Sequence, residues 1–273
     1  MKTPLLSVCL ITYNHENFIR QAIEGVLMQK VDFDWELIIA EDCSTDNTRT
    51  IVLEYKEKYP DFIKLILQEK NVGAAKNWMD LLSAPKSKYI AYFEGDDYWT
   101  DSLKLQKQVD FLEANLEYSM CFHQVGILRN EKVEKDIISA HVPETTTILD
   151  LAKGNYIHTC SVVFRNNLFA KFPEYFKKAP VGDYFLHLLN ARYGAIKCFE
   201  EVMGAYRIHN SSSWSSKTQE EQILLWVPFL RKIKPNFSKE VQSILDQQIT
   251  SFTKSNSNNM KLYLRRILNL FRI

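Results

Sequence analysis

The chain has 273 residues, 46% hydrophobic and 25% charged, which is typical of a globular protein with enough apolar residues for a core. Its 34 basic and 33 acidic residues give a net charge of +1, which argues against nucleic acid as a partner. The five cysteines form no CxxC pair, and neither a signal peptide nor a spanning apolar run is present, so we expect a cytoplasmic protein.

Strands and helices are expected to alternate through the first hundred residues. Continuous apolar runs predict buried strands over 5–13, 35–42, 62–68 and 88–97. Apolar residues at helical spacing predict helices over 17–29, 44–60 and 71–84, the second with an N-cap at Ser44 or Thr45. This alternation predicts an α/β fold with a mostly parallel sheet flanked by helices.

Polar side chains follow the first, second and fourth of these strands. Ligands of open α/β sheets bind beyond the carboxyl ends of the strands, so these side chains should share a cleft. They are Thr12, Tyr13, Asn14, Glu41, Asp42, Glu94, Asp96 and Asp97. The last three are carboxylates that repel one another unless a cation lies among them, and oxygen ligands suit Mg²⁺ or Mn²⁺. The alternative is a solvated acidic loop, or the cap of a helix beginning near Thr100 or Asp101.

Four segments carry a further signal, and they are SVCLITYNHENFIRQAIEGVLMQ, IIAEDCSTDNT, NVGAAKN and EGDD. Together they resemble the family 2 glycosyltransferases of the GT-A fold, over roughly residues 5 to 215. The chain departs from the family pattern at three positions, because Glu41 and Glu94 each replace an aspartate and Cys43 replaces a glycine. The resemblance implies a GT-A (Rossmann-like) domain over 1–215 and a helical C-terminal extension over 216–273.

The resemblance further implies that the chain binds a nucleotide-diphosphate sugar as donor. Thr12, Tyr13 and Asn14 would line the base and ribose, and Asp42 would accept a hydrogen bond from the base. The other residues implied at the donor are Glu16, Glu41, Asn71, Gly73, Lys76, Glu94 and Arg207. Ordinary turn chemistry is the alternative for Thr12 and Asn14, and stabilisation of a helix N-terminus is favoured for Asp46.

A divalent metal, Mn²⁺ or Mg²⁺, is implied at the EGDD motif. Asp96 would be a direct ligand, while Glu94 would act through the ribose or water. Asp97 would either bind the metal or orient its neighbour. His209 could reach the metal as a neutral imidazole, although a lone histidine is more often structural. Alternatively, Arg207 or His209 would bind the diphosphate.

Glycosyl transfer also needs a base for the acceptor hydroxyl. A strand is expected at the centre of 153–169, and a helix within 179–194 opens with Gly182 and Asp183. This helix start is similar to the family's, which implies that Asp183 is the catalytic base; a simple N-cap is the alternative. The implied reaction is an inverting transfer, from UDP-sugar to a hydroxyl of a saccharide or lipid-linked acceptor, in cell-surface polysaccharide or glycolipid synthesis.

Three further segments carry weaker expectations. A strand over 202–214 would deliver Arg207 and His209, and the serine-rich loop at 211–216 with Trp214 suits a lid over the donor or a polar linker. His158 and Thr159 fall where related enzymes shape the acceptor site.

The last sixty residues show helical patterns over 223–235, 241–252 and 260–273. In the final pattern an apolar arc faces Lys261, Arg265, Arg266 and Arg272, so residues 261–273 could contact an anionic membrane at its inner face or pack on the domain.

Other functions fit the sequence less well. A sugar nucleotidyltransferase would need a glycine-rich, arginine-containing loop where this chain has TYNHEN, and a nicotinamide dehydrogenase would need GxGxxG there. A module that binds a nucleotide sugar without turning it over stays open.

Overall fold

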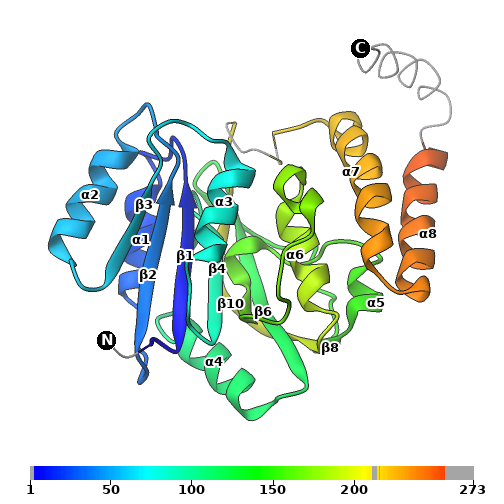
Figure 1. The fold of residues 1–273 in the computed structure, drawn as a ribbon, viewed down its shortest axis with the longest axis horizontal. Coiled ribbons are helices and arrows are strands. Elements are labelled where there is room, and N and C mark those ends of the chain that lie inside the picture. The colour runs from blue at the N-terminus through cyan, green and yellow to red at the C-terminus, as the bar shows by residue number, and fades with distance from the viewer. Residues whose placement is uncertain (1–2, 211–213, 215, 256–273) are drawn as a thin grey trace.

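The fold is an α/β sandwich around one large sheet, seen in a computed structural model that describes residues 3–210, 214 and 216–255. Figure 1 shows helices on both faces of the sheet and a stack formed by α6, α7 and α8 beside its second half. The strands are β1 (Leu6–Thr12), β2 (Trp35–Glu41), β3 (Ile63–Leu67), β4 (Tyr89–Glu94), β5 (Tyr98–Trp99), β6 (Tyr118–Arg129), β7 (Lys132–Lys135), β8 (Thr145–Thr146), β9 (Val163–Arg165) and β10 (Ala195–Ile208).

Eight α-helices and three short 3₁₀-helices are found among the described residues. The α-helices are α1 (Ile19–Leu27), α2 (Thr48–Lys58), α3 (Ala74–Ser83), α4 (Lys104–Ala114), α5 (Ile148–Leu151), α6 (Gly182–Asn190), α7 (Gln219–Ile233) and α8 (Lys239–Ser255). The 3₁₀-helices are η1 (Thr159–Ser161), η2 (Glu174–Lys178) and η3 (Lys234–Asn236). The helical patterns predicted within 223–252 thus become α7 and α8.

The strand order is β3-β2-β1-β4-β9-β6-β10-β5, with β7 beside β6 and β8 beside β10. Strands β1 to β4 run parallel, β9 is antiparallel to both of its neighbours, and β6 and β10 are parallel again. The register pairs Thr12 with Glu41 and Ile11 with Glu94, so β1, β2 and β4 end together. The segments that follow these three strands therefore meet at one edge of the sheet.

Alternate residues of the central strands feed two separate cores. Val8 and Leu10 of β1 join the core under α1, α2 and α4, whereas Cys9 joins the core under α3 and α6 to α8. Because both faces are buried, the central strands are apolar at nearly every position, which is the pattern that predicted them.

Three local predictions differ from the structure. Helix α2 begins at Thr48 rather than beside Ser44 or Thr45, and Asn47 precedes it without a side-chain cap. The expected strand at the centre of 153–169 is confined to β9, because the segment before it forms η1. Strand β10 begins at Ala195, seven residues before the expected start at 202.

The C-terminal predictions are only partly covered. Helices α7 and α8 pack against α6, since Phe229 and Leu245 share a core with Phe185. The amphipathic pattern over 260–273 and most of the serine-rich loop at 211–216 lie outside the described residues. Across the part of the chain that is described, no helix combines the length and the apolar character needed to cross a membrane.

His187 of α6 makes stability depend on pH in a predictable direction. The side chain is fully buried, and neither ring nitrogen has a hydrogen-bond partner among the described residues. Burial lowers the pKa of His187 to about 3, so the native state keeps it neutral while the unfolded chain binds a proton below pH of about 6.5. Stability from this residue is therefore lost as the pH falls from about 6.5 towards 3.

Replacing His187 with leucine removes this loss of stability at low pH. We expect the free energy of unfolding of His187→Leu, relative to the parent, to rise by about 1.4 kcal/mol for each pH unit below about 6.5. Urea unfolding at several pH values between 7.5 and 5 measures this difference. A difference that stays constant with pH would show that His187 is not held neutral in the native state.

Candidate donor and catalytic site

The segments after β1 and β2 are joined by hydrogen bonds into one wall. Asn14 donates its backbone N–H to Ser44 Oγ at 3.0 Å and accepts the N–H of Thr45 on Oδ1 at 2.8 Å. Glu16 accepts the N–H of Asn47 at 3.0 Å. These contacts use the serine and threonine that the sequence offered as helix caps, and they fix the predicted donor residues Asn14 and Glu16 at the strand ends.

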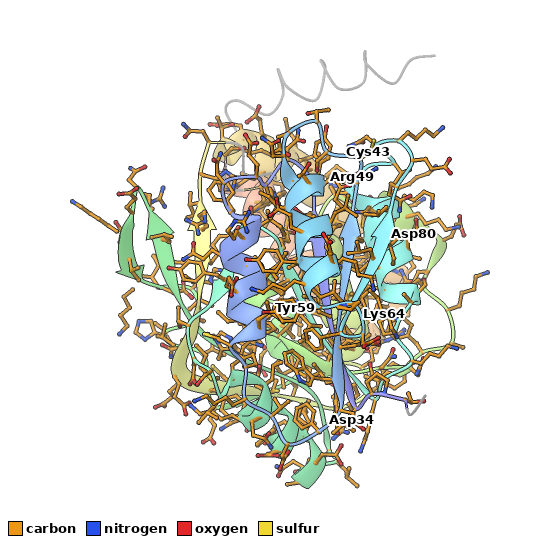
Figure 2. All side chains as sticks on the ribbon, turned by 90° about the vertical axis from the view of Figure 1, so that its left-hand side faces the viewer. Asp34, Cys43, Arg49, Tyr59, Lys64 and Asp80 are labelled. Atoms are coloured by element: carbon orange, nitrogen blue, oxygen red, sulfur yellow. The ribbon has the colours of Figure 1, made fainter. Side chains whose placement is uncertain are left out.

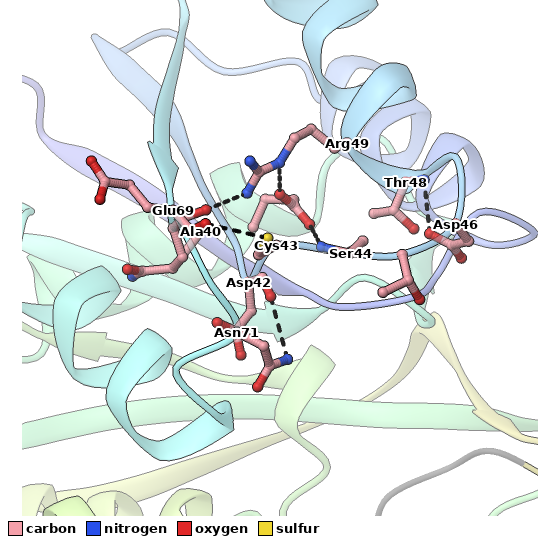
Figure 3. Close-up of polar contacts among 12 residues, drawn as sticks. Ala40, Asp42, Cys43, Ser44, Asp46, Thr48, Arg49, Glu69 and Asn71 are labelled. Atoms are coloured by element: carbon pink, nitrogen blue, oxygen red, sulfur yellow. Dashed lines mark hydrogen bonds and ion pairs between the residues drawn. The ribbon is translucent and has the colours of Figure 1, made fainter.

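Asp42 holds the turn that leads into α3. Its side chain is buried and accepts the backbone N–H groups of Val72 at 2.7 Å and Gly73 at 3.0 Å. The amide of Asn71 donates to the backbone carbonyl of Asp42 at 3.3 Å (Figure 3). Gly73 has φ of 84°, a conformation that side chains disfavour, which explains the glycine. The predicted donor residues Asp42, Asn71 and Gly73 therefore form one unit.

Glu41 anchors the segment that leads from β2 into α2. Its carboxylate is fully buried, accepts the N–H of Ser44 at 2.6 Å and forms an ion pair with Arg49. Arg49 also donates to the carbonyl of Gln68 at 2.6 Å, which ties α2 to the end of β3 (Figure 3). The glutamate thus shapes the wall behind the strand ends, and its donor contact stays a prediction.

Cys43 adopts the left-handed conformation, with φ of 56°, at the position where the family pattern has glycine. Its thiol donates to the carbonyl of Glu69 at 3.6 Å, which places the side chain against the turn after β3. Figure 2 shows Cys43 and Arg49 at the end of the sheet opposite Asp34, where the parallel strands finish. Asp46, as favoured from sequence, stabilises the start of α2 by accepting the N–H of Thr48 at 2.9 Å.

Within the EGDD motif, Asp96 is the carboxylate best placed to bind a ligand. Its Oδ2 accepts a hydrogen bond from His209 Nε2 at 3.0 Å and lies 3.9 Å from His15 Nε2. Its Oδ1 is buried and has no hydrogen-bond partner among the described residues. A buried carboxylate oxygen without a partner is costly, so this atom is available to a bound ligand.

Asp97 and Arg207 lock the motif from the other side. Asp97 is buried and accepts the backbone N–H of Arg207 at 2.8 Å, and the guanidinium of Arg207 donates to the Asp96 carbonyl at 2.7 Å. The same guanidinium donates to Gln21 at 2.7 Å and lies over the ring of Phe18. This geometry favours orientation of Asp96 over direct metal contact for Asp97.

The carboxylates are strongly coupled through their charges. Burial, and then the charges of Asp96 and Asp183, raise the pKa of Glu94 to about 8. Burial and the Asp96 charge raise the pKa of Asp97 well above its usual range. Burial also opposes ionisation of Asp96, but the hydrogen bond from His209 and the nearby His15 lower its pKa below the usual value. The three carboxylates therefore oppose one another's ionisation, and a bound cation would relieve this repulsion.

The cluster fits a divalent cation that the substrate, rather than the protein, supplies with most of its ligands. Among the described residues, no three His, Cys, Asp or Glu side chains come together as a complete metal site. Mg²⁺ and similar ions are often held by one or two protein carboxylates together with substrate phosphates. Asp96, through its unpartnered Oδ1, and His209 are the residues that would hold such an ion.

A cavity of about 900 Å³ joins this cluster to Asp183. Glu94, Asp96 and Asp183 all line it, together with Tyr92 and Tyr206. Asp183 is the second residue of α6, whose N-cap is Val181, so the N-cap alternative for Asp183 is wrong. Its carboxylate accepts the Asn155 amide at 3.2 Å, and burial raises its pKa. A carboxylate with a raised pKa, facing a cavity, can take up a proton from a substrate.

Gly182 allows α6 to bring Asp183 to the cavity. A methyl group at this position would lie 1.8 Å from the ring of Trp78, which is buried on α3 against Tyr92 and Phe176. Only glycine lets the start of α6 approach α3 this closely. The glycine before the candidate base is therefore a packing requirement of the cavity wall.

Some of the remaining predicted residues line the cavity, while others lie at the end of β1 or on the surface of α3. His158, Thr159 and Trp214 line the same cavity, as an acceptor site or lid would require. Thr12 is buried and lies 3.3 Å from His15 Nδ1 through its hydroxyl. Tyr13 is 40% exposed, while Lys76 forms an ion pair with Asp80 at 2.7 Å on the surface of α3.

Sequence reasoning missed the residues that hold the site from a distance. Gln21 fixes Arg207, Asn155 fixes Asp183, and Asp136 accepts a hydrogen bond from His158 at 3.0 Å. No spacing rule signals these pairs, because their members are between 22 and 186 residues apart. His15 was also missed, but a signal for it existed, because it lies in the same strand-end segment as Thr12.

Comparison with known proteins identifies the family. The sequence model described as Glycosyl transferase family 2 matches residues 7–172. The chain belongs to this family. It is 37% identical over 220 residues to the uncharacterized protein Rv1520 of Mycobacterium tuberculosis, a match that covers 77% of this chain and 61% of that protein. The chain therefore spans less than two thirds of the length of this relative.

A further relative carries a stated activity in its name. The UDP-Glc:alpha-D-GlcNAc-diphosphoundecaprenol beta-1,3-glucosyltransferase WfgD of Escherichia coli is 30% identical over 219 residues, which cover 79% of this chain and 82% of WfgD.

Solved structures confirm the predicted GT-A fold class. Staphylococcus aureus TarS in complex with UDP-GlcNAc aligns with a TM-score of 0.66 at 20% identity, covering 93% of this chain and 73% of TarS. The mannosyltransferase PcManGT from Pyrobaculum calidifontis, in complex with GDP-Man and Mn²⁺, gives the same TM-score at 15% identity, covering 100% and 82% of the two chains.

Proposed function

We propose that this family 2 member is a metal-dependent, inverting glycosyltransferase that moves a sugar from a UDP-sugar to an acceptor hydroxyl. The observation that carries this proposal is that Asp96, with its unpartnered oxygen, and Asp183, at the start of α6, line the same cavity. One carboxylate is poised to hold the donor through a cation, and the other is poised to accept a proton. A role in cell-surface polysaccharide or glycolipid synthesis is part of the proposal.

The relatives support the choice of donor and metal. The name of WfgD states a UDP-glucose donor, and TarS was solved with UDP-GlcNAc. PcManGT was solved with GDP-Man and Mn²⁺, which supports a divalent cation. For this chain we take uridine as the base, with Tyr13 and Asp42 as its predicted contacts at the ends of β1 and β2.

The proposed chemistry is a single displacement at the anomeric carbon. The acceptor oxygen attacks from the side opposite the diphosphate, its proton passes to the Asp183 carboxylate, and the bond between the anomeric carbon and the diphosphate oxygen breaks. A divalent cation, when bound at Asp96, would neutralise charge on the departing nucleoside diphosphate. Asn155 holds the Asp183 carboxylate in place by donating to Oδ2.

A nucleotide panel tests this proposal on the protein as it stands. We expect UDP with Mn²⁺, at about a hundred times its dissociation constant, to raise the melting temperature by about 5 °C or more. UDP with EDTA should raise it less, and GDP and ADP should raise it less than UDP. Stronger stabilisation by a purine diphosphate would contradict the uridine assignment, and no stabilisation by any of them would contradict a nucleotide-sugar enzyme. Binding of the nucleotide sugar without release of UDP in acceptor screens would favour a binding module.

A further inference from the structure

A second cavity, of about 340 Å³, lies between the C-terminal halves of α3 and α6. Leu82 and Ser83 of α3 line it from one helix, and Leu186 and Asn190 of α6 line it from the other. The residues that line it are all different from those that line the cavity with the candidate catalytic carboxylates. The glycosyl transfer proposed above therefore makes no use of this space.

Much of the lining of this second cavity is apolar and aromatic. The sheet contributes Ile90 of β4 and Phe164 of β9, which are both buried. The segment after β9 contributes Phe169 and Phe172, whose rings pack edge to face with their centroids 5.1 Å apart. Engineered apolar cavities of about 150 Å³ bind benzene. A cavity with these walls therefore has the size and the surface to hold a ring-sized apolar group.

The charged residues of the lining are either exposed or already bonded. Lys171, Glu174 and Lys177 are exposed, and Lys177 forms an ion pair with Glu174 at 3.3 Å. The guanidinium of Arg165 donates to three backbone carbonyls and to the hydroxyl of Tyr89. None of these four side chains offers a buried, unpaired charge to a ligand. An ionised ligand group would thus lose its hydration inside this cavity without gaining an ion pair.

One polar group of the lining lacks a partner. Asn190, the last residue of α6, is 1% exposed, and its Nδ2 makes no hydrogen bond with any residue that the structure describes. The lining amide of Asn166 differs, because it donates to the carbonyl of Ser87 at 2.9 Å. A buried amide donor without an acceptor is costly, and an oxygen of a bound ligand would satisfy it.

We propose that this second cavity binds a small uncharged molecule that has a ring-sized apolar body and one hydrogen-bond acceptor. The body would pack among Phe164, Phe169 and Phe172, and the acceptor would take the hydrogen bond of Asn190 Nδ2. A purely apolar molecule would leave this donor unpartnered, and a carboxylate would be buried against a single amide. The bound molecule would contact both α3 and α6. The site does not depend on the proposed glycosyl transfer.

Acetophenone and ethylbenzene are matched probes, because they have nearly the same shape and only acetophenone has a carbonyl oxygen. We expect ligand-observed NMR titration of the parent protein to give a dissociation constant for acetophenone on the order of 1 mM or below. Asn190→Leu keeps the size of the side chain but removes the donor, so the ratio of acetophenone affinity to ethylbenzene affinity should fall about tenfold. Phenylacetate, which carries a carboxylate, should bind more weakly than acetophenone.

Two further variants test where the probes bind. Met79 of α3 is half-buried and lines the second cavity, so Met79→Trp should narrow it and weaken both probes by about tenfold or more. Asn236→Leu is the matched control for Asn190→Leu, because Asn236 is half-buried and lines neither cavity. It should leave both affinities at the parent values. Near-ultraviolet circular dichroism checks the folding of each variant without any ligand.

The outcomes bear on the ligand class and on the site separately. An unchanged affinity ratio in Asn190→Leu, or phenylacetate binding as tight as that of acetophenone, would overturn the proposed ligand class. Affinities that Met79→Trp leaves unchanged, or no binding of either probe to the parent, would overturn the site itself. UDP affinity with Mn²⁺, measured on the same preparations, reports on the donor site alone.

Discussion

The Asp183→Asn variant is expected to transfer sugar about 10² to 10⁴ times more slowly than the parent, because positioned acid–base groups contribute on this order to rate. Asparagine keeps the size of the side chain and can still accept the hydrogen bond that Asn155 donates to Asp183. It has no carboxylate to take up the acceptor proton. The proposed donor contacts at Asp96 and Asp42 do not involve Asp183, so UDP affinity should be retained.

The experiment measures UDP affinity by calorimetry and the transfer rate on one preparation of Asp183→Asn. Asp110→Asn is the matched control, since Asp110 is exposed on α4 and does not line the cavity. It should behave as the parent in both measurements. Transfer at the parental rate would remove Asp183 from the mechanism, whereas weakened UDP binding would give it a structural or metal-related role.

The parallel half of the sheet was predictable because each of its strands and helices follows from the pattern of apolar residues within its own segment. Strands buried on both faces need apolar residues at almost every position, and helices that cover them need apolar residues at helical spacing. The strand-end rule then places Asp42 and Asp96 at one edge, where the structure has them. The family resemblance added Asp183, which no local rule distinguishes from an ordinary acidic residue in the first turn of a helix.

The segments that were predicted wrongly depend on local competition or distant partners. The centre of 153–169 alternates like a strand, but the Ser161 hydroxyl donates to the His158 carbonyl at 2.6 Å and favours the 3₁₀ turn of η1. The early part of β10 is interrupted by register shifts near Val202, and Glu200 and Glu201 are exposed there, so it lacks a continuous apolar run. Local alternation cannot reveal either effect.

The roles within the wall behind the donor site also escaped the sequence. Glu41 resembles a ligand-binding acid by position, and that position gives no sign of its ion pair with Arg49, eight residues away, or of its burial. Ser44 and Thr45 resemble helix caps, yet both bind Asn14, which is about thirty residues away. A residue type and its spacing predict what a side chain can do, and its three-dimensional partners decide what it does.

Replacing Asp96 with asparagine is expected to abolish the gain in UDP affinity that Mn²⁺ provides. Asp96 Oδ1 is the buried carboxylate oxygen without a partner among the described residues, and it lies in the cavity lining. Asparagine retains the shape and can still accept the hydrogen bond from His209, so the protein should stay folded. It removes the negative charge, and loss of a direct metal contact should cost at least the 10- to 100-fold in metal affinity typical of outer-shell changes.

Calorimetric titration of UDP, with Mn²⁺ and with EDTA, separates the metal-dependent part of the affinity from the rest. The affinity of Asp96→Asn for UDP in Mn²⁺ should fall to the value that the parent shows in EDTA. Asp97→Asn is the informative companion, because Asp97 is buried and accepts the backbone N–H of Arg207, a bond that asparagine can keep. We expect it to retain most of the Mn²⁺-dependent gain, since Asp97 orients the motif from behind. If Asp97→Asn lost that gain while Asp96→Asn kept it, the direct metal contact would belong to Asp97.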